Sequence, residues 1–254
     1  MNSEDGLADT ATKVPEVTLL FWIVKIAATT LGEIGGDAVS MSLNLGYLVA
    51  SAIFAALFLL AVAAQIKATR FHPFLYWATI IATTTVGTTL ADFADRSLGI
   101  GYSGGTALLF ALLMISLLVW HRSTGSVSIS SIRTPSAEIF YWVTIMCSQT
   151  LGTALGDWTA DSAGVGYLGG ALVFGALLTL VALAHYRTKL SGTLLFWTAF
   201  IVTRPLGAVV GDFVDKPLAS GGLALSRYTA SAAILVFIAS CLLLFKQKPA
   251  VRLH

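Results

Sequence analysis

Charged residues are scarce in this chain of 254 residues. Only 11% are Asp, Glu, Lys or Arg, whereas 56% are hydrophobic and the mean hydropathy is +0.83. Its 15 basic and 13 acidic side chains are too few to cover the surface of a soluble protein of this size. The shortage excludes a soluble domain, a nucleic-acid-binding protein and a disordered chain. We therefore expect an integral membrane protein whose main partner is the lipid bilayer.

Cysteine pairs and nucleotide-binding motifs are also lacking. Cys147 and Cys241 lie in apolar segments without a Cys or His partner at metal-ligand spacing, which argues against a disulfide or a zinc site. The sequence has no P-loop, so nothing supports coupling to ATP hydrolysis, and we expect no cofactor. Residues 1–15 are polar and acidic without a basic start, so they predict a short cytoplasmic tail rather than a cleaved signal peptide.

Long apolar runs fill most of the remaining chain. Eight of them occur, at 16–38, 45–66, 74–94, 102–121, 137–160, 166–186, 192–214 and 226–245. Each is close to the roughly 20 residues that a helix needs to cross a bilayer. Continuous apolarity without alternation favours helices over strands. The sequence predicts an all-α membrane protein with eight transmembrane helices.

The basic residues between these runs are distributed unequally. Ten lie on the tails and on the loops that join even-numbered to odd-numbered runs: Lys13, Lys67, Arg70, Arg122, Arg133, Arg187, Lys189, Lys246, Lys248 and Arg252. The opposite loops hold three, Arg96, Lys216 and Arg227. The positive-inside rule therefore predicts that both termini are cytoplasmic.

Four tryptophans reveal an internal repeat. Trp22, Trp77, Trp142 and Trp197 are separated by 55, 65 and 55 residues. Each is followed after ten residues by Gly32, Gly87, Gly152 or Gly207, after fourteen by Gly36, Ala91, Gly156 or Gly211, and after fifteen by Asp37, Asp92, Asp157 or Asp212. We predict four two-helix hairpins that all insert in the same orientation, as parallel repeats with pseudo-twofold or pseudo-fourfold symmetry.

The predicted boundaries follow this register. The repeats occupy 16–70, 71–122, 136–190 and 191–246, with a polar loop at 123–135, the polar tail at 1–15 and a basic cytoplasmic tail at 247–254. The pattern resembles a family of bacterial integral membrane proteins built from four tandem two-helix repeats of unknown function, each with a Trp. That resemblance implies a location in the bacterial inner membrane and supplies no activity.

The glycine and small residue four apart in each repeat form a stripe that allows close approach of helices in lipid. We interpret these eight positions, Gly32, Gly36, Gly87, Ala91, Gly152, Gly156, Gly207 and Gly211, as packing residues. The repeat tryptophans are interpreted as amphipathic packing or interface residues. The first helices of the repeats are therefore expected to meet near the bundle centre.

Carboxylates share that neighbourhood. Eight of the 13 acidic residues form motif pairs three or four residues apart: Glu33 with Asp37, Asp92 with Asp95, Asp157 with Asp161, and Asp212 with Asp215. On a continuous helix each pair would share one face, and like charges that close favour binding of a cation or a proton. A purely structural role at polar helix ends is the alternative. The helix dipole disfavours an anion at a C-terminal end, which argues against that alternative.

Two basic residues lie inside predicted helices. Lys25 precedes Glu33 by eight residues and Arg204 precedes Asp212 by eight. We interpret them as counter-charges that compete with a cation for the carboxylates, although Lys25 can also extend towards the cytoplasmic surface. His72, His121 and His185 adjoin basic or proline residues at helix ends and are interpreted as interfacial anchors.

The predicted function is a secondary transporter for a small cation. Oxygen ligands without Cys or His suit hard ions, so proton-coupled efflux of a divalent cation such as Mn²⁺ is favoured. Transport of a small organic cation, and a membrane scaffold or stress sensor without flux, remain alternatives. An aspartyl protease needs two unlike aspartates, whereas the four motifs are near-equivalent, so we expect no enzyme. Homo-oligomerisation stays open.

Overall fold

The structure is a computed structural model that describes residues 12–132 and 134–250. Its long helices are Leu19–Asp37 (α2), Gly46–Lys67 (α3), Pro73–Asp92 (α4), Gly101–Thr124 (α5), Pro135–Asp157 (α6), Gly166–Arg187 (α7), Gly192–Asp215 (α8) and Arg227–Leu244 (α9). These eight helices match the eight predicted runs to within a few residues. The predicted all-α membrane fold is confirmed.

Local signals set the helix starts. The Thr18 hydroxyl accepts a hydrogen bond from the backbone N–H of Phe21 at the start of α2, and Thr134 caps α6 in the same way. Pro73 and Pro135 begin α4 and α6, where their missing N–H costs nothing. The outer helices α3, α5 and α7 begin at glycines with φ between +72° and +75°, a conformation that other residues rarely adopt.

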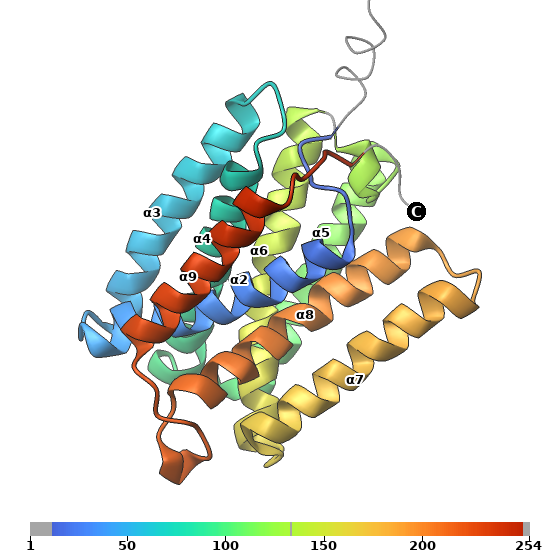
Figure 1. The fold of residues 1–254 in the computed structure, drawn as a ribbon. Helices are drawn as coiled ribbons and strands as arrows, with labels where there is room; N and C mark the ends of the chain where they lie inside the picture. The colour runs from blue at the N-terminus through green and yellow to red at the C-terminus, as the bar shows by residue number, and fades with distance from the viewer. Residues whose placement is uncertain (1–11, 133, 251–254) are drawn as a thin grey trace, which may run out of the picture.

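The centre of the bundle is a closed ring of four helices (Figure 1). α2, α4, α6 and α8 are the first helices of the four repeats; each packs against the next, and α8 packs against α2. Because the last repeat closes onto the first, the four repeats surround one axis. This arrangement agrees with the predicted pseudo-fourfold packing of parallel repeats.

The second helix of each repeat packs against the first helix of the following repeat. α3 lies on α4, α5 on α6, α7 on α8, and α9 returns to α2, as the neighbouring ribbons in Figure 1 show for α7 and α9. About 61% to 67% of the most apolar stretch is buried in α2, α4 and α8, against 11% to 17% in the outer helices. The outer helices therefore present the lipid-facing surface.

Seven of these helices are long and apolar enough to cross a membrane. The exception is α6, which is 23 residues long and occupies the same place in the inner ring as α2, α4 and α8. Its buried polar residues, such as Ser148 and Gln149, lower its hydropathy without facing lipid. We call the end with the chain termini the terminal end and the end with the aspartate motifs the motif end.

The repeat tryptophans form an aromatic collar near the terminal end. The aromatic residue before each repeat Trp packs on the Trp of the next repeat. The ring-centroid distances are 5.4 Å for Phe21–Trp77, 5.8 Å for Tyr76–Trp142, 6.3 Å for Tyr141–Trp197 and 6.0 Å for Phe196–Trp22. The fourth contact closes the circle, so the tryptophans join neighbouring repeats.

The small-residue stripe lies at the contacts between inner helices. A Cβ added to Gly32 would lie 2.2 Å from Thr84, one added to Gly152 would lie 2.2 Å from Arg204, and one added to Gly207 would lie 2.1 Å from Thr29. Gly87 meets Gln149 of the following repeat in the same manner. Each of these glycines thus contacts the same repeat position in the next repeat, which is occupied by Thr84, Gln149, Arg204 or Thr29. The contact of Gly207 with the first repeat closes the ring.

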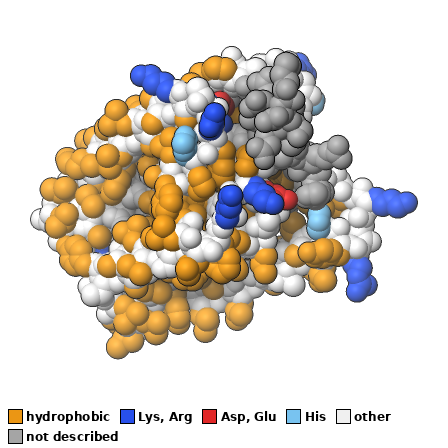
Figure 2. All heavy atoms as spheres, turned by 45° about the horizontal axis from the view of Figure 1, so that its top comes forward, with side chains coloured by type: hydrophobic (Ala, Val, Ile, Leu, Met, Phe, Trp, Pro, Cys, Tyr) orange, Lys and Arg blue, Asp and Glu red, His pale blue; other side chains and the backbone are white. Residues whose placement is uncertain are grey.

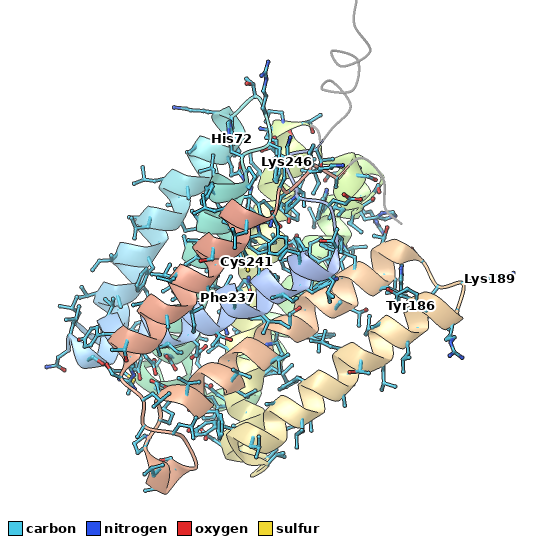
Figure 3. All side chains as sticks on the ribbon, viewed as in Figure 1. His72, Tyr186, Lys189, Phe237, Cys241 and Lys246 are labelled. Atoms are coloured by element: carbon cyan, nitrogen blue, oxygen red, sulfur yellow. The ribbon has the colours of Figure 1, made fainter. Side chains whose placement is uncertain are left out.

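The two ends of the described chain lie together. Residues 12–16 pair with 248–250 through backbone hydrogen bonds, including Glu16 N to Lys248 O at 2.9 Å and Ala250 N to Val14 O at 2.8 Å. The rest of both predicted tails, together with Arg133 and Arg252, lies outside the described residues. His72 and Lys246 lie at this terminal end (Figure 3). Lys, Arg and His side chains gather on this face, whereas hydrophobic side chains cover the flank (Figure 2).

Candidate functional site

The motif aspartates lie where the inner helices change their winding. α2, α4 and α6 end at Asp37, Asp92 and Asp157, and π-helical turns follow at Ala38–Ser42, Phe93–Ser97 and Trp158–Ser162. A π turn is wider than an α turn, so it changes the direction in which the side chains after the aspartate point. In the fourth repeat α8 stays α-helical through Asp212 to Asp215.

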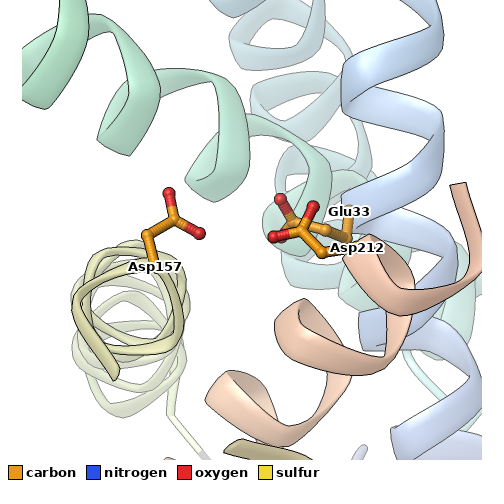
Figure 4. Close-up of side chains that lie close together, drawn as sticks. All are labelled: Glu33, Asp157 and Asp212. Atoms are coloured by element: carbon orange, nitrogen blue, oxygen red, sulfur yellow. The ribbon is translucent and has the colours of Figure 1, made fainter. Parts of the chain in front are cut away.

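Three buried carboxylates from three repeats converge at the motif end. One oxygen each of Glu33, Asp157 and Asp212 lies within 4.8 Å of the other two, and the side chains face one another in Figure 4. Each residue is 3% exposed. Like charges this close in a low-dielectric site cannot all stay ionised without a compensating cation or proton. This carboxylate triad is the core of the candidate site.

Both groups of three carboxylates join residues of different repeats. Asp212 and Asp215, one of the motif pairs expected from sequence spacing, form the second group with Asp37. Asp161 is exposed, and Asp95 is buried outside both groups. Asp95 and Asp161 lie inside π turns, whereas Glu33 with Asp37 and Asp212 with Asp215 lie on continuous α-helix.

Arg204 pairs with Glu33 of the first repeat, whereas the sequence spacing had related it to Asp212 of its own helix. It is fully buried, and its Nη2 donates a hydrogen bond to Oε2 of Glu33 at 2.9 Å. The same nitrogen donates to the hydroxyl groups of Thr88 and Thr153. Glu33, Thr88 and Thr153 each follow their repeat Trp by eleven residues. One guanidinium of the fourth repeat therefore contacts the same register position in the other three.

Lys25 does not form the contact that its spacing suggested. Its side chain is fully buried, its Nζ lies 3.8 Å from the ring centroid of Phe200, and it has no hydrogen-bond partner among the described residues. It follows its repeat Trp by three residues, whereas Arg204 follows by seven, so the two are not equivalent. Helical side chains tilt towards the helix N-terminus, which directs Lys25 away from Glu33.

Two basic residues assigned to loops by sequence bridge neighbouring motifs. Arg96 pairs with Asp92 of its own repeat at 3.1 Å and with Asp157 of the next at 3.3 Å. Lys216 pairs with Asp212 of its own repeat at 3.0 Å and with Asp37 of the first repeat. The two contacts are related by the half-chain offset of 120 residues. These two bridges are therefore related by pseudo-twofold symmetry, whereas the backbone of the four repeats has pseudo-fourfold symmetry.

Sequence reasoning missed this role because it counted Arg96 and Lys216 only as loop charges. Both follow their motif aspartate by four residues, a spacing that brings a basic group back beside the carboxylate. The alignment of the repeats contained a signal for this role, since the position of Arg96 and Lys216 is occupied by Met41 and Asp161 in the other two repeats. A comparison of the repeats at this position would have found the twofold pattern.

Further polar groups surround the bridging cations at the motif end. Arg227 pairs with Asp215 and lies 3.5 Å from Asp37. Arg96 donates hydrogen bonds of 3.1 Å to the hydroxyl groups of Tyr47 and Tyr102. These contacts hold the Arg96 and Arg227 side chains in place at the motif end of the inner helices.

Lys216 lies just beyond the end of α8 and is largely buried. Burial alone would lower its pKa, but the neighbouring carboxylates Asp212, Asp37 and Asp215 outweigh that effect and raise the pKa above its ordinary value. Lys216 is therefore a permanent cation at physiological pH.

The remaining candidates lie apart from this site. His72, His121 and His185 are exposed, and Cys147 and Cys241 are free thiols. These positions leave oxygen atoms as the ligands that the site could offer to a cation.

Six carboxylates share four basic groups in the ion pairs of the motif end and the adjoining Arg204. The carboxylates thus exceed the cations in this network by two charges. Such a site can hold a cation that replaces a tethered Lys or Arg, or it can take up protons. Bidentate carboxylates would bind hard cations through oxygen.

Comparison with known proteins gives the family without a function. A family model described as Repeat of Unknown Function (DUF347) matches residues 20–71, 75–126, 140–191 and 195–247. No curated protein and no solved structure matches the chain. The four matched segments coincide with the four repeats that close the inner ring. The chain belongs to this family of tandem-repeat proteins.

Proposed function

We propose that this protein is a secondary transporter that exchanges a small cation, with a divalent ion such as Mn²⁺ favoured, for protons. The convergence of Glu33, Asp157 and Asp212 supports the proposal, since three buried carboxylates are drawn together inside an apolar bundle. Stability alone would not favour such a group, because like charges repel strongly at low dielectric. Binding of a cation offsets that repulsion.

Basic side chains of the protein itself pair with the carboxylates when no substrate is bound. Arg204 holds Glu33, and Lys216 and Arg96 hold Asp212 and Asp157. A substrate cation has to displace these contacts, and their return favours its release. The same side chains would then keep the carboxylates neutralised during the empty half of the cycle, as alternating access requires.

The excess of two carboxylates in the ion-pair network favours a divalent cation over a monovalent one. All the ligands in the triad are oxygen atoms, which suit Mn²⁺, Mg²⁺ or Ca²⁺ better than soft metals. Two protons would replace one divalent ion without changing the charge of the site. Exchange of one divalent cation for two protons is therefore the stoichiometry that we propose.

The test is ion flux in liposomes that contain the purified protein. An imposed pH gradient is expected to drive Mn²⁺ movement, measured with a metal-sensitive dye, together with opposite proton movement, measured with a pH dye. Asp157→Asn is expected to abolish flux because it removes a ligand of the triad. Asp161→Asn is the matched control, because Asp161 lies in the same motif with an exposed side chain.

Wild-type protein that moves none of Mn²⁺, Mg²⁺, Ca²⁺ or Na⁺ under either sign of pH gradient would exclude cation transport. Equal loss of flux in Asp157→Asn and Asp161→Asn would remove the triad from the mechanism. An organic cation that competes with Mn²⁺ would instead extend the substrate class.

A further inference from the structure

Asp95 and Asp215 occupy the same place in the repeat but have different surroundings. Each follows its repeat Trp by eighteen residues. Asp215 is ion-paired with Arg227 and belongs to a carboxylate group with Asp37. Asp95 is 7% exposed, and neither of its carboxyl oxygens has a hydrogen-bond partner among the described residues. The second half of the chain thus supplies a cation that the first half lacks.

The surroundings of Asp95 offer little compensation for a negative charge. Arg96 adjoins it in the chain, but its guanidinium is directed to Asp92, Asp157 and the tyrosine hydroxyls of α3 and α5. The Oδ1 atom of Asp95 faces Gly105 of α5, and a Cβ added to that glycine would lie 2.1 Å from this oxygen. On α6 the Cys147 thiol lines the same groove as Gly105.

A groove on the outer surface is lined by Ala94, the neighbour of Asp95 in the chain, and by Gly105, which faces the Asp95 carboxyl group. It has a volume of about 240 Å³ and lies between α4, α5 and α6, with Leu90, Gly105, Leu108, Met146 and Cys147 among its lining residues. Leu90 and Leu108 are exposed on the lipid-facing side. Gly105, in the wall of the groove, faces Asp95, and its lack of a side chain leaves room for the carboxyl group there.

We propose that Asp95 binds one of the exchanged protons, which it takes up and releases beside the groove, separately from the carboxylates that bind the cation. A buried carboxylate without a partner is costly when ionised, so the resting form carries the proton on one carboxyl oxygen. Release of the proton leaves the carboxylate anion, and uptake restores the acid. The role of Asp95 in exchange rests on the proposed transport function, whereas its protonation in the resting protein does not.

Dicyclohexylcarbodiimide tests the protonated acid directly. This apolar reagent partitions into lipid and adds the O–H of a carboxylic acid across its C=N bond, and the adduct rearranges to a stable N-acylurea without a leaving group. Incubation of the protein in liposomes at neutral pH, followed by peptide mass spectrometry, is expected to show one carbodiimide on Asp95. Asp215, held by Arg227, is expected to stay unlabelled and serves as the internal control.

Infrared spectroscopy provides a measurement that does not depend on entry of the reagent. The protonated-carboxyl C=O band at neutral pH is expected to lose one component in Asp95→Asn and none in Asp161→Asn. Absence of both the label and the band would overturn the proposal, and so would equal labelling of Asp95 and Asp215. An infrared band without a carbodiimide label would show that Asp95 is protonated but that the reagent does not reach it through the groove. That outcome would overturn the groove as the access route.

Flux separates this proposal from the transport proposal. Asp95→Asn is expected to retain Mn²⁺ binding while the dependence of Mn²⁺ movement on the pH gradient is lost. Loss of Mn²⁺ binding in this variant would assign Asp95 to the cation site and overturn its separate role. If wild-type protein shows no flux of any ion, transport and the exchange role fall together, while the labelling and the infrared band still decide whether Asp95 is protonated.

Discussion

Arg204 of the fourth repeat and Glu33 of the first form a fully buried ion pair of 2.9 Å. The pair joins the two ends of the repeat array, where α8 packs against α2. Glu33 also belongs to the carboxylate triad, so the pair adjoins the candidate site. The energetic role of the pair can be separated from its functional role by substitution.

Arg204→Met is expected to destabilise the protein by about 3–5 kcal/mol, because it leaves Glu33 buried without a counter-charge. The double variant Arg204→Met with Glu33→Leu is expected to recover most of that loss, since both charges are then absent. Thermal unfolding in detergent measures both effects. A single variant as stable as wild type would contradict a stabilising role for the pair.

Gly207→Ala is expected to lower the melting temperature, with a cost of about 1–3 kcal/mol for overpacking. Its new Cβ would lie 2.5 Å from Thr29 Cβ and 2.9 Å from the Thr29 carbonyl carbon, so rotation of a side chain cannot relieve the contact. Gly35→Ala is the matched control, because it has no atom within 4 Å of the added Cβ. Equal effects of the two substitutions would exclude the close helix contact.

Tyr141→Phe tests the aromatic collar. The Tyr76 and Tyr141 hydroxyl groups are 2.7 Å apart and buried, so removal of one leaves the other without its partner. The expected cost is about 1–3 kcal/mol for the single variant, and the double variant with Tyr76→Phe should be closer to wild type. A double-mutant cycle on unfolding free energies measures the coupling, and additive losses would contradict it.

Lys216→Met is expected to destabilise the protein at neutral pH, because it removes the cation between Asp37 and Asp212. The folded-state pKa of Lys216 is raised above its unfolded value of about 10.4, so its contribution is complete below that pH and declines only as strongly alkaline pH approaches the folded-state pKa. The stability difference between wild type and variant should stay constant from neutral to mildly alkaline pH. A difference that vanished over this range would indicate an unpaired lysine.

Added Mn²⁺ is expected to raise the melting temperature if the triad binds it. At a concentration a hundredfold above the dissociation constant, ligand binding stabilises the folded state by about 2.7 kcal/mol. Asp212→Asn should remove the effect, while Asp161→Asn should retain it. Stabilisation by Mn²⁺ that persisted in Asp212→Asn would place the ion elsewhere.

The sequence predicted most of the fold because the repeat register carries it. Hydrophobic length gave the helices, and the Trp, Gly and Asp positions gave four equivalent units. The contacts of Gly32 with Thr84 and of Phe21 with Trp77 occur between one repeat and the next, a relationship that the repeat spacing does not specify. Pairing of the outer helices with the following repeat was likewise visible only in the packing.

Sequence spacing proposed the carboxylates of the candidate site but not their grouping across repeats. Local spacing suggested Glu33 with Asp37 and Asp157 with Asp161, on the assumption of continuous α-helices. The π turn after Asp157 breaks that assumption for Asp161, whereas Glu33 and Asp37 both lie in α2, and closure of the ring brings Glu33 to Asp157 and Asp212. Helical periodicity constrains neighbours within one helix, but contacts between helices depend on their rotation and axial position.

The sequence by itself determined a multi-pass helical membrane protein of four repeats with carboxylates at one end of the inner helices, because hydropathy and spacing are properties of the linear chain. Tertiary structure alone decided which charges meet: Arg204 with Glu33, Arg96 with Asp157, and Lys216 with Asp37. Those pairs join repeats far apart in sequence. Their geometry is fixed by close packing of the inner helices around the axis, where burial makes each unpaired charge costly.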